Sequence, residues 1–248
     1  MASNSPGQLL EWDMSFFGVR VGRIEATRLT AIGMRVALDW ASRNDIECLY
    51  FLCVADDDES VRAAETHGFH LVDVRLTSLW QRPRTMQRLP QGEESIVRRY
   101  RDEDKAAIED IAAVAYSDTR FFYDRRFGAE RAAALYREWA AKSCDGAADA
   151  VLVAADERDV RGFITCQLQP SHHGQIGLAG VHSGARGSGV GQALVEAALT
   201  FFMDKGADSV QVVTQGRNIA AQRLYQKCGF RSHSLHLWYH KWFGVNEE

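Results

Sequence analysis

The sequence predicts an α/β protein with a mixed sheet (α+β), and three observations support this fold class. Strand-like and helix-like segments alternate along all 248 residues. Hydrophobic residues make up 46% of the chain and charged residues 25%, which is typical of a globular protein with a sizeable core. The alternation restarts after the proline-containing stretch 82–94. We therefore expect two domains, residues 1–92, which end in a linker, and residues 93–248.

The first domain has the order β, α, β, α, β. Aromatic and β-branched residues surround a glycine in its opening segment, which predicts one or two strands. The next segment has apolar residues at helical spacing, and a continuous apolar run of strand length follows. The segments are 9–27 (strands), 30–43 (helix), 46–55 (strand), 56–68 (helix) and 69–80 (alternating strand).

The second domain is longer and mixes strands and helices in the same way. Its helices show apolar residues at helical spacing, and its strands are short apolar runs. In chain order the segments are 95–101 (strand), 102–116 (helix), 117–128 (loop), 129–144 (helix), strands at 150–156, 161–169 and 175–181, a glycine loop, a helix to about residue 205, 208–215 (strand), 218–227 (helix) and 230–243 (a strand pair).

The two domains share a short pattern that indicates an internal repeat. Gly68-Phe69 and Gly229-Phe230 each end a helix and begin a strand, and aligning them places Ala64 opposite Tyr225. The glycine loop has no counterpart in the first domain, so we expect a degenerate copy that kept the fold and lost the ligand site. The alternative is chance recurrence, because glycine commonly ends helices.

Composition excludes several classes of protein. Five scattered cysteines without a CxxC pair suit reduced thiols and indicate no metal site. The first residues lack a leader pattern, and no apolar run approaches the roughly 20 residues of a membrane helix. We therefore expect a cytoplasmic protein without membrane association. A net charge of −4 argues against a nucleic-acid partner.

The stretch ARGSGVG, residues 185–191, follows a strand and precedes a helix. The first amides of a helix lack internal partners, and glycines allow an anion to approach them closely. The loop lacks the GK[ST] of a Walker motif, and no acidic residue ends the next strand as in dinucleotide-binding folds. The stretch therefore predicts a phosphate-binding turn of another type.

The glycine loop and a second motif resemble the GCN5-related N-acetyltransferases (GNAT). Arg186, Gly189 and Gly191 match the first motif of that family, and Asn218, Tyr225 and the following Gly-Phe pair match the second, over roughly residues 95–243. The resemblance implies a complete C-terminal GNAT domain after a degenerate GNAT-like one. It also implies acetyl-coenzyme A (acetyl-CoA) as cofactor, with no metal.

The resemblance implies a role for each matching residue. The loop would hold the coenzyme diphosphate, a strand that splays from its neighbour at a bulge near Gly180 would pair with the pantetheine, and Asn218 would cap a helix beside the coenzyme. Tyr225 would give a proton to the departing thiolate; the alternative is a core aromatic. The expected cofactor-binding residues are Ala179, Gly180, Val181, Arg186, Gly187, Ser188, Gly189, Val190, Gly191, Gln192, Asn218 and Tyr225.

We expect the acceptor to be a small-molecule amine. Val213 stands where family members that acetylate protein N-termini often carry a glutamate, which counts against that substrate class, although a base could come from elsewhere. The opening segment, the loop YSDTRFFYDRRFG and the degenerate first half resemble the acetyltransferases of dTDP-4-amino-4,6-dideoxygalactose (dTDP-fucosamine), which implies a dTDP-sugar substrate.

In that loop, arginines suit a diphosphate and aromatic rings suit a base or a sugar face. We therefore expect substrate contacts from Arg120, Phe121, Phe122 and Tyr123. The alternative is a surface hinge whose aromatics anchor it to the core. Other functions that remain open are acetylation of another small amine or a protein N-terminus, and a non-catalytic acyl-CoA-binding protein. A homodimer is also possible.

Overall fold

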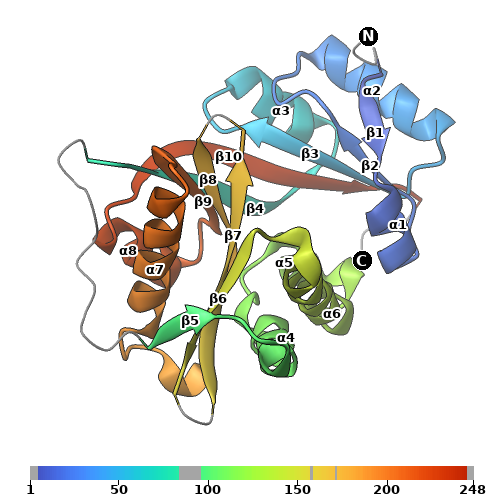
Figure 1. Ribbon diagram of the computed structural model, residues 1–248. Helices are drawn as coiled ribbons and strands as arrows, with labels where there is room; N and C mark the ends of the chain where they lie inside the picture. The colour runs from blue at the N-terminus through green and yellow to red at the C-terminus, as the bar shows by residue number, and fades with distance from the viewer. Residues whose placement is uncertain (1–4, 84–95, 157–158, 171, 245–248) are drawn as a thin grey trace. The chain divides into compact units, whose positions relative to one another are not determined.

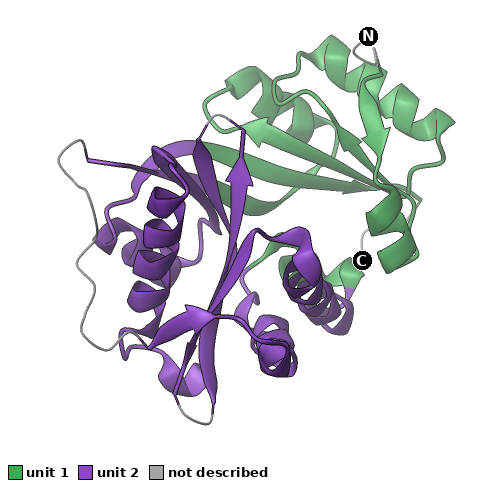
Figure 2. Ribbon diagram, in the orientation of Figure 1, with its two compact units in different colours: residues 1–75, 119–127, 235–248 green, residues 76–118, 128–234 purple. Residues whose placement is uncertain are grey.

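The computed structural model describes residues 5–83, 96–156, 159–170 and 172–244. The chain forms two compact units, shown in Figure 2. Unit 1 contains residues 1–75, 119–127 and 235–248, and unit 2 contains residues 76–118 and 128–234. Each unit therefore combines segments that are distant in sequence. The expected domain boundary at residues 92–93 lies outside the described residues.

Unit 1 contains all or part of five strands, with helices on both faces. Their order is β1-β2-β3-β10-β4, in which β2 and β3 are parallel and the pairs β1–β2 and β3–β10 are antiparallel. The elements are β1 (Gly7–Leu9), α1 (Glu11–Phe17), β2 (Val21–Ile24), α2 (Ala31–Arg43), β3 (Cys48–Val54), α3 (Asp58–Thr66), the first part of β4 (His70–Gln81), α5 (Arg120–Tyr123), the 3₁₀ turn η2 (Arg125–Phe127) and the second part of β10 (Arg231–Trp242).

The two faces of the unit 1 strands differ. Alternate residues of β3 and β10, such as Phe51 and Tyr239, pack with α2 and α3 in one apolar cluster. On the other face, Phe17 of α1 stacks on Phe121 of α5, with ring centroids 5.3 Å apart, and Phe127 packs against Tyr50. The second face therefore carries aromatic residues from the expected substrate loop.

Helix α1 differs from the expected strand within residues 9–27. Trp12 and Phe16, which are four residues apart, stack with ring centroids 5.1 Å apart, and Phe17 is buried. Gly18 ends the helix in the left-handed region at φ 67°, where its N–H donates to the carbonyl of Met14. Aromatic residues favour strands by intrinsic propensity, but this spacing and the glycine cap stabilise a short helix.

Unit 2 has the strand order β9-β8-β7-β6-β5, in which only β8 and β9 are parallel among these described pairs. The elements are β5 (Val97–Arg99), η1 (Asp102–Asp104), α4 (Lys105–Ala115), α6 (Ala129–Lys142), η3 (Ser143–Ala147), β6 (Ala150–Ala155), β7 (Val160–Gln169), β8 (His173–Val181), η4 (Ser183–Ala185), α7 (Val190–Asp204), β9 (Ser209–Gln215) and α8 (Ile219–Lys227). The expected strand pair at 230–243 is instead the single strand β10.

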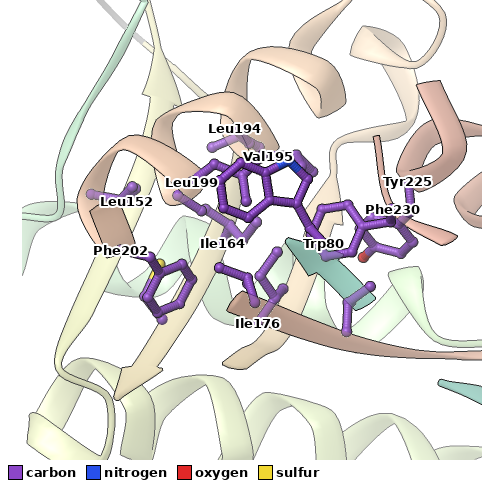
Figure 3. Packing of buried hydrophobic residues seen from close by; sticks show 14 of the residues in the cluster. Trp80, Leu152, Ile164, Ile176, Leu194, Val195, Leu199, Phe202, Tyr225 and Phe230 are labelled. Carbon is purple, nitrogen blue, oxygen red and sulfur yellow. The ribbon is translucent and has the colours of Figure 1, made fainter. Parts of the chain in front are cut away.

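Helices cover both faces of the unit 2 strands. Helices α4 and α6 pack together on one face, and α7 packs on the other (Figure 1). Under α7, Phe202 and Leu199 meet Ile164 and Ile176 of the strands, and the cluster continues to Tyr225 (Figure 3). The core of unit 2 thus extends to the residue expected to carry out the chemistry. The mixed α/β fold is as expected.

The helix–glycine–strand corner has the same geometry in both units. Gly68 and Gly229 have φ of 71° and 89°. The N–H of the following phenylalanine donates to a carbonyl five residues earlier in each unit, that of Ala64 or of Tyr225, over 3.0 Å. The two corners therefore have the same local geometry, and the internal repeat itself stays a prediction.

Among the described helices, none combines the length and the apolar character needed to cross a lipid bilayer.

Candidate active site

The glycine turn exposes the N-terminus of α7. Gly187 and Gly189 have φ of 79° and 90°, which disfavour any residue with a Cβ, and a Cβ built on either meets no atom within 4 Å. The amide of Ala193 donates to the carbonyl of Gly189 over 3.0 Å, so the preceding amides of the first turn have no acceptor within the helix. With the positive end of the helix dipole, they form a site for an anion.

A cavity of about 520 Å³ lies beside this turn, and all of its lining residues belong to unit 2. Three cations line it, Arg186, Arg223 and Lys227, and one acid, Asp118. Most of the expected cofactor-binding residues line it too: Ala179, Gly180, Val181, Arg186, Gly187, Gly189, Gly191, Gln192, Asn218 and Tyr225.

Two expected cofactor-binding residues do not line this cavity. The Ser188 hydroxyl donates to the carbonyl of Ala185 over 2.7 Å, and the Val190 side chain is buried in the core under α7. The space in front of the glycines and the surplus of cations suit a ligand with a diphosphate, so the residues present fit coenzyme A.

Strands β8 and β9 pair only along part of their length. The parallel register runs from His173 opposite Ser209 to Ile176 opposite Val212. Directly after Ile176, β8 has a bulge, because Gly177 and Leu178 together face the single residue Thr165 of β7. The Thr165 hydroxyl accepts a hydrogen bond from the Leu178 amide over 2.8 Å.

The bulge therefore lies three residues before Gly180, the position near which we expected it. Gly180 itself pairs with Phe163, and a Cβ there would come within 2.8 Å of the Phe163 ring and 3.0 Å of Ile111 on α4. The glycine thus allows α4 to pack closely on β8. Beyond the bulge, Ala179 to Val181 leave the register with β9 and line the cavity.

Helix α8 presents Asn218 and Tyr225 to the same cavity. The Asn218 side chain caps the helix and accepts a hydrogen bond from the Ala221 amide over 3.0 Å. Tyr225 is 6% exposed, and burial, with a smaller contribution from Cys228, raises the pKa of its hydroxyl far above its usual value. The phenol is therefore protonated at neutral pH and can donate a proton.

Tyr116 does not line the cavity but contacts a residue that does, and the sequence reasoning did not identify it. Its hydroxyl donates to the carbonyl of Ala179 over 3.0 Å, and its ring stacks on Tyr136 with centroids 4.4 Å apart. Burial raises the pKa of Tyr116, and the nearby Tyr225 raises it further. Tyr116 follows the end of α4 and has no local motif, so only the fold brings it to β8. By contrast, the spacing of Arg223 and Lys227, one helical turn apart, could have been recognised in the sequence.

The structure divides the expected substrate loop 117–128 between the two units. Ser117 and Asp118 line the cavity of unit 2. The four residues expected to contact substrate form α5 of unit 1, where Phe121 is buried, Phe122 is half-buried and Tyr123 is 59% exposed. The guanidinium of Arg120 lies 4.2 Å from the ring centroid of Trp238.

Within the described residues, no group of three or more His, Cys, Asp or Glu side chains is arranged to hold a metal ion.

Relatives with known names match more than half of the chain. SpsD, a spore coat polysaccharide biosynthesis protein of Bacillus subtilis (strain 168), is 26% identical over 57% of this chain and 48% of its own length. The dTDP-fucosamine acetyltransferase of Escherichia coli O6:H1 (strain CFT073) is 24% identical over 56% of this chain and 59% of its own length. The mycothiol acetyltransferase of Pseudarthrobacter chlorophenolicus is 30% identical over 56% and 42%. The chain spans about half of the length of these relatives.

The fold has relatives among solved structures. A GCN5-related N-acetyltransferase from Sphaerobacter thermophilus superimposes with a TM-score of 0.67 over 97% of this chain and 78% of that chain, at 16% identity. This likeness confirms the expected GNAT fold. A model of the acetyltransferase (GNAT) family matches residues 98–230, which is more than half of the chain and includes both the glycine turn and Tyr225. The chain therefore belongs to the GNAT family of acetyltransferases.

Proposed function

We propose that the protein is an N-acetyltransferase that uses acetyl-CoA and acetylates the amine of a small molecule by direct attack on the thioester. One observation carries this proposal: the open glycine turn and the protonated phenol of Tyr225 line the same cavity. The turn can donate hydrogen bonds to the diphosphate of coenzyme A, and the phenol can give a proton to the sulfur that leaves the acetyl group.

The chain has groups for each part of the coenzyme. The amides at the start of α7, with Arg186, would hold the diphosphate, and the backbone of Ala179 to Val181 would pair with the pantetheine. Acetyl-CoA supplies the activated acetyl group. The hydroxyl of Tyr225 donates a proton to the thiolate, and burial of the ring keeps that proton in place until then.

For the acceptor, we propose a nucleotide-linked amino-deoxysugar of the dTDP-4-amino-4,6-dideoxyhexose type. The relatives named dTDP-fucosamine acetyltransferase and spore coat polysaccharide biosynthesis protein support a sugar substrate. Val213, in place of a glutamate on β9, counts against a protein N-terminus. We propose that Arg120, Phe121, Phe122 and Tyr123 contribute to binding of this substrate, and that the site needs no metal.

A second candidate is acetylation of another small amine. The match to mycothiol acetyltransferase at 30% identity favours it, since this identity is higher than that to either sugar-related protein. A non-catalytic acyl-CoA-binding protein is a third candidate, and the cavity alone is compatible with it.

Turnover assays with a panel of amines separate these candidates. The purified protein is incubated with acetyl-CoA and, in separate reactions, dTDP-4-amino-4,6-dideoxygalactose, the unacetylated precursor of mycothiol, and a peptide with a free N-terminus; release of free thiol is measured. We expect turnover with the dTDP-sugar and none with the peptide. Turnover with the mycothiol precursor alone would support the second candidate, and coenzyme binding without any turnover the third.

Replacement of the phenol tests the chemistry. We expect Tyr225→Phe to bind coenzyme A with unchanged affinity by calorimetry and to lose roughly 100-fold or more in kcat, the usual contribution of a general acid. Tyr100→Phe is the control, because the hydroxyl of Tyr100 contacts Asp102 away from the cavity. Unchanged kcat in Tyr225→Phe would remove the residue from the mechanism, and failure of the wild-type protein to bind coenzyme A would refute the proposed function.

A further inference from the structure

Unit 1 carries three arginines that we call the arginine cluster: Arg23 of β2, Arg75 of β4 and Arg120 of α5. Arg23 is in register with Tyr50, and Tyr50 with His240, so these side chains share one face of the strands. It is the face opposite to the one that α2 and α3 cover.

The three arginines of the cluster interact electrostatically. Burial lowers the pKa of Arg75, and the positive charges of Arg120 and Arg23 lower it further. Among the described residues, none of the three makes an ion pair. Two carboxylates are nearby. Burial raises the pKa of Asp13 although Arg120 and Arg23 oppose this rise, and Asp124 is engaged elsewhere.

The contacts of Arg120 hold it in one orientation. Its guanidinium carbon lies 4.2 Å from the ring centroids of Tyr50 and Trp238. One of its terminal nitrogens (Nη1) lies 2.8 Å from Nε2 of His240, and Nδ1 of the same imidazole lies 2.7 Å from the carboxylate of Asp124.

The chemistry of these groups determines the imidazole tautomer. A carboxylate only accepts hydrogen bonds and a guanidinium only donates them, so His240 carries its proton on Nδ1 and presents a bare Nε2. Asp124 also accepts a hydrogen bond from the indole of Trp242 over 2.9 Å. His240 and Asp124 therefore orient Arg120 without neutralising it.

Two buried polar atoms, one of Tyr50 and one of Arg75, have no hydrogen-bond partner among the described residues. The Tyr50 hydroxyl is fully buried and lacks a hydrogen-bond partner, as does the buried Nε of Arg75. An unpaired buried hydroxyl or guanidinium N–H costs folding free energy, and a cluster of like charges adds to that cost. A ligand that accepts hydrogen bonds and carries negative charge would offset both.

We propose that the arginine cluster, together with Tyr50, binds a phosphoryl group of a phosphorylated ligand. Guanidinium groups donate several hydrogen bonds in a planar fork that matches phosphate oxygens, and phosphoryl groups carry the charge that the cluster lacks. The site belongs to unit 1, whereas the glycine turn and Tyr225 belong to unit 2. Because Arg120 is also one of the residues proposed to bind the dTDP-sugar, the inference rests on the proposed function at that residue, but its test measures binding and needs no acetyl transfer.

Calorimetry with inorganic pyrophosphate at low ionic strength tests this site on the full chain. Loss of one charge-assisted hydrogen bond typically weakens binding about tenfold or more. We expect that effect in Arg75→Gln and several-fold weakening in Tyr50→Phe. The control is Arg35→Gln, an exposed arginine on α2, which covers the opposite face; its affinity for pyrophosphate should equal that of the wild type.

A second measurement separates lost binding from lost folding. Because Arg75→Gln and Tyr50→Phe remove unpaired buried groups, both free proteins should melt at or above the wild-type temperature, and pyrophosphate should raise the melting temperature of the wild type but not of Arg75→Gln. Normal binding by Arg75→Gln would overturn the proposal, as would the absence of millimolar binding by the wild type.

The glycine turn of α7 could also take pyrophosphate, so Gly189→Ala is titrated in parallel. Unchanged affinity in Gly189→Ala supports the arginine cluster. Loss of binding in Gly189→Ala but not in Arg75→Gln would assign the anion to the turn and overturn the proposal. A titration with dTDP then distinguishes the sources of the phosphoryl group: affinity above that of pyrophosphate indicates a nucleotide ligand, and equal affinity indicates free phosphate compounds.

Discussion

The neutral imidazole of His240 makes the stability of unit 1 depend on pH. The residue is 1% exposed, and its pKa is lowered from 6.5 to about 4; burial is the main cause, Asp124 opposes the shift, and the positive charge of Arg120 contributes to it. Although burial opposes ionisation of Asp124, the hydrogen bonds from His240 and Trp242 hold the pKa of its carboxyl below the usual value, so it stays ionised in weak acid. Protonation of Nε2 would place a positive charge against the Arg120 guanidinium.

The size of the effect follows from the two pKa values. The unfolded chain takes up a proton near pH 6.5, whereas the folded protein does so only near pH 4. Between these values the unfolded state binds more protons, so the free energy of unfolding falls as the pH falls. The expected loss from His240 is about 2 kcal/mol between pH 7 and pH 5, and about 3 kcal/mol once the pH lies below both pKa values.

Urea unfolding at pH 7 and pH 5, followed by tryptophan fluorescence, measures this loss. His240→Asn keeps an amide N–H for Asp124 but cannot titrate. We expect it to be less stable than the wild type at pH 7. Its free energy of unfolding should fall by about 2 kcal/mol less than that of the wild type between pH 7 and pH 5. The control is His233→Asn, an exposed histidine of the same strand, which should follow the wild type. If His240→Asn and the wild type lose the same free energy between the two pH values, the neutral buried imidazole is refuted.

Two further predictions concern unit 2. In Gly189→Ala, the backbone φ of 90° costs about 1–2 kcal/mol of strain once the residue has a Cβ, and that Cβ enters the open space before the helix. Calorimetry should therefore show roughly tenfold weaker binding of coenzyme A. Unchanged affinity would argue against the turn as the diphosphate site. Thr165→Val removes the hydroxyl that accepts the hydrogen bond of the Leu178 amide in the bulge. Urea unfolding should show a free energy of unfolding about 1–3 kcal/mol lower for this variant, whereas Thr165→Ser should match the wild type. Equal stability of the valine variant and the wild type would show that the bulge does not need this hydrogen bond.

Much of the fold could be predicted because periodicity reports local burial. The apolar run of β3 and the helical spacing of α2 were both recognised, since each element buries a continuous face. Residues 11–17 were expected in a strand because their aromatic content outweighed the helical spacing of Trp12 and Phe16. The helix α5 was expected as a loop, because four residues are too few to show a period.

The candidate site was predictable where its residues follow one another in sequence. The glycine turn and the Asn218-to-Tyr225 segment are local motifs, and both line the cavity. Tyr116 could not be found in this way, because its contact with Ala179 joins residues 63 positions apart. The arginine cluster has the same character: Arg23, Arg75 and Arg120 come from three distant segments. Strand register brings Arg23 opposite Tyr50, and the packing of α5 brings Arg120 over the Tyr50 ring.

The corner found in both units depends on main-chain atoms and not on the side chain at the position of Ala64 or Tyr225. Each corner is closed by hydrogen bonds between main-chain atoms, from the phenylalanine amide to the carbonyl of Ala64 or Tyr225. These hydrogen bonds do not involve the side chain at that position, so replacing tyrosine by alanine there would remove a proton donor and leave the corner intact. The corner would therefore tolerate either residue, as the predicted degenerate repeat requires.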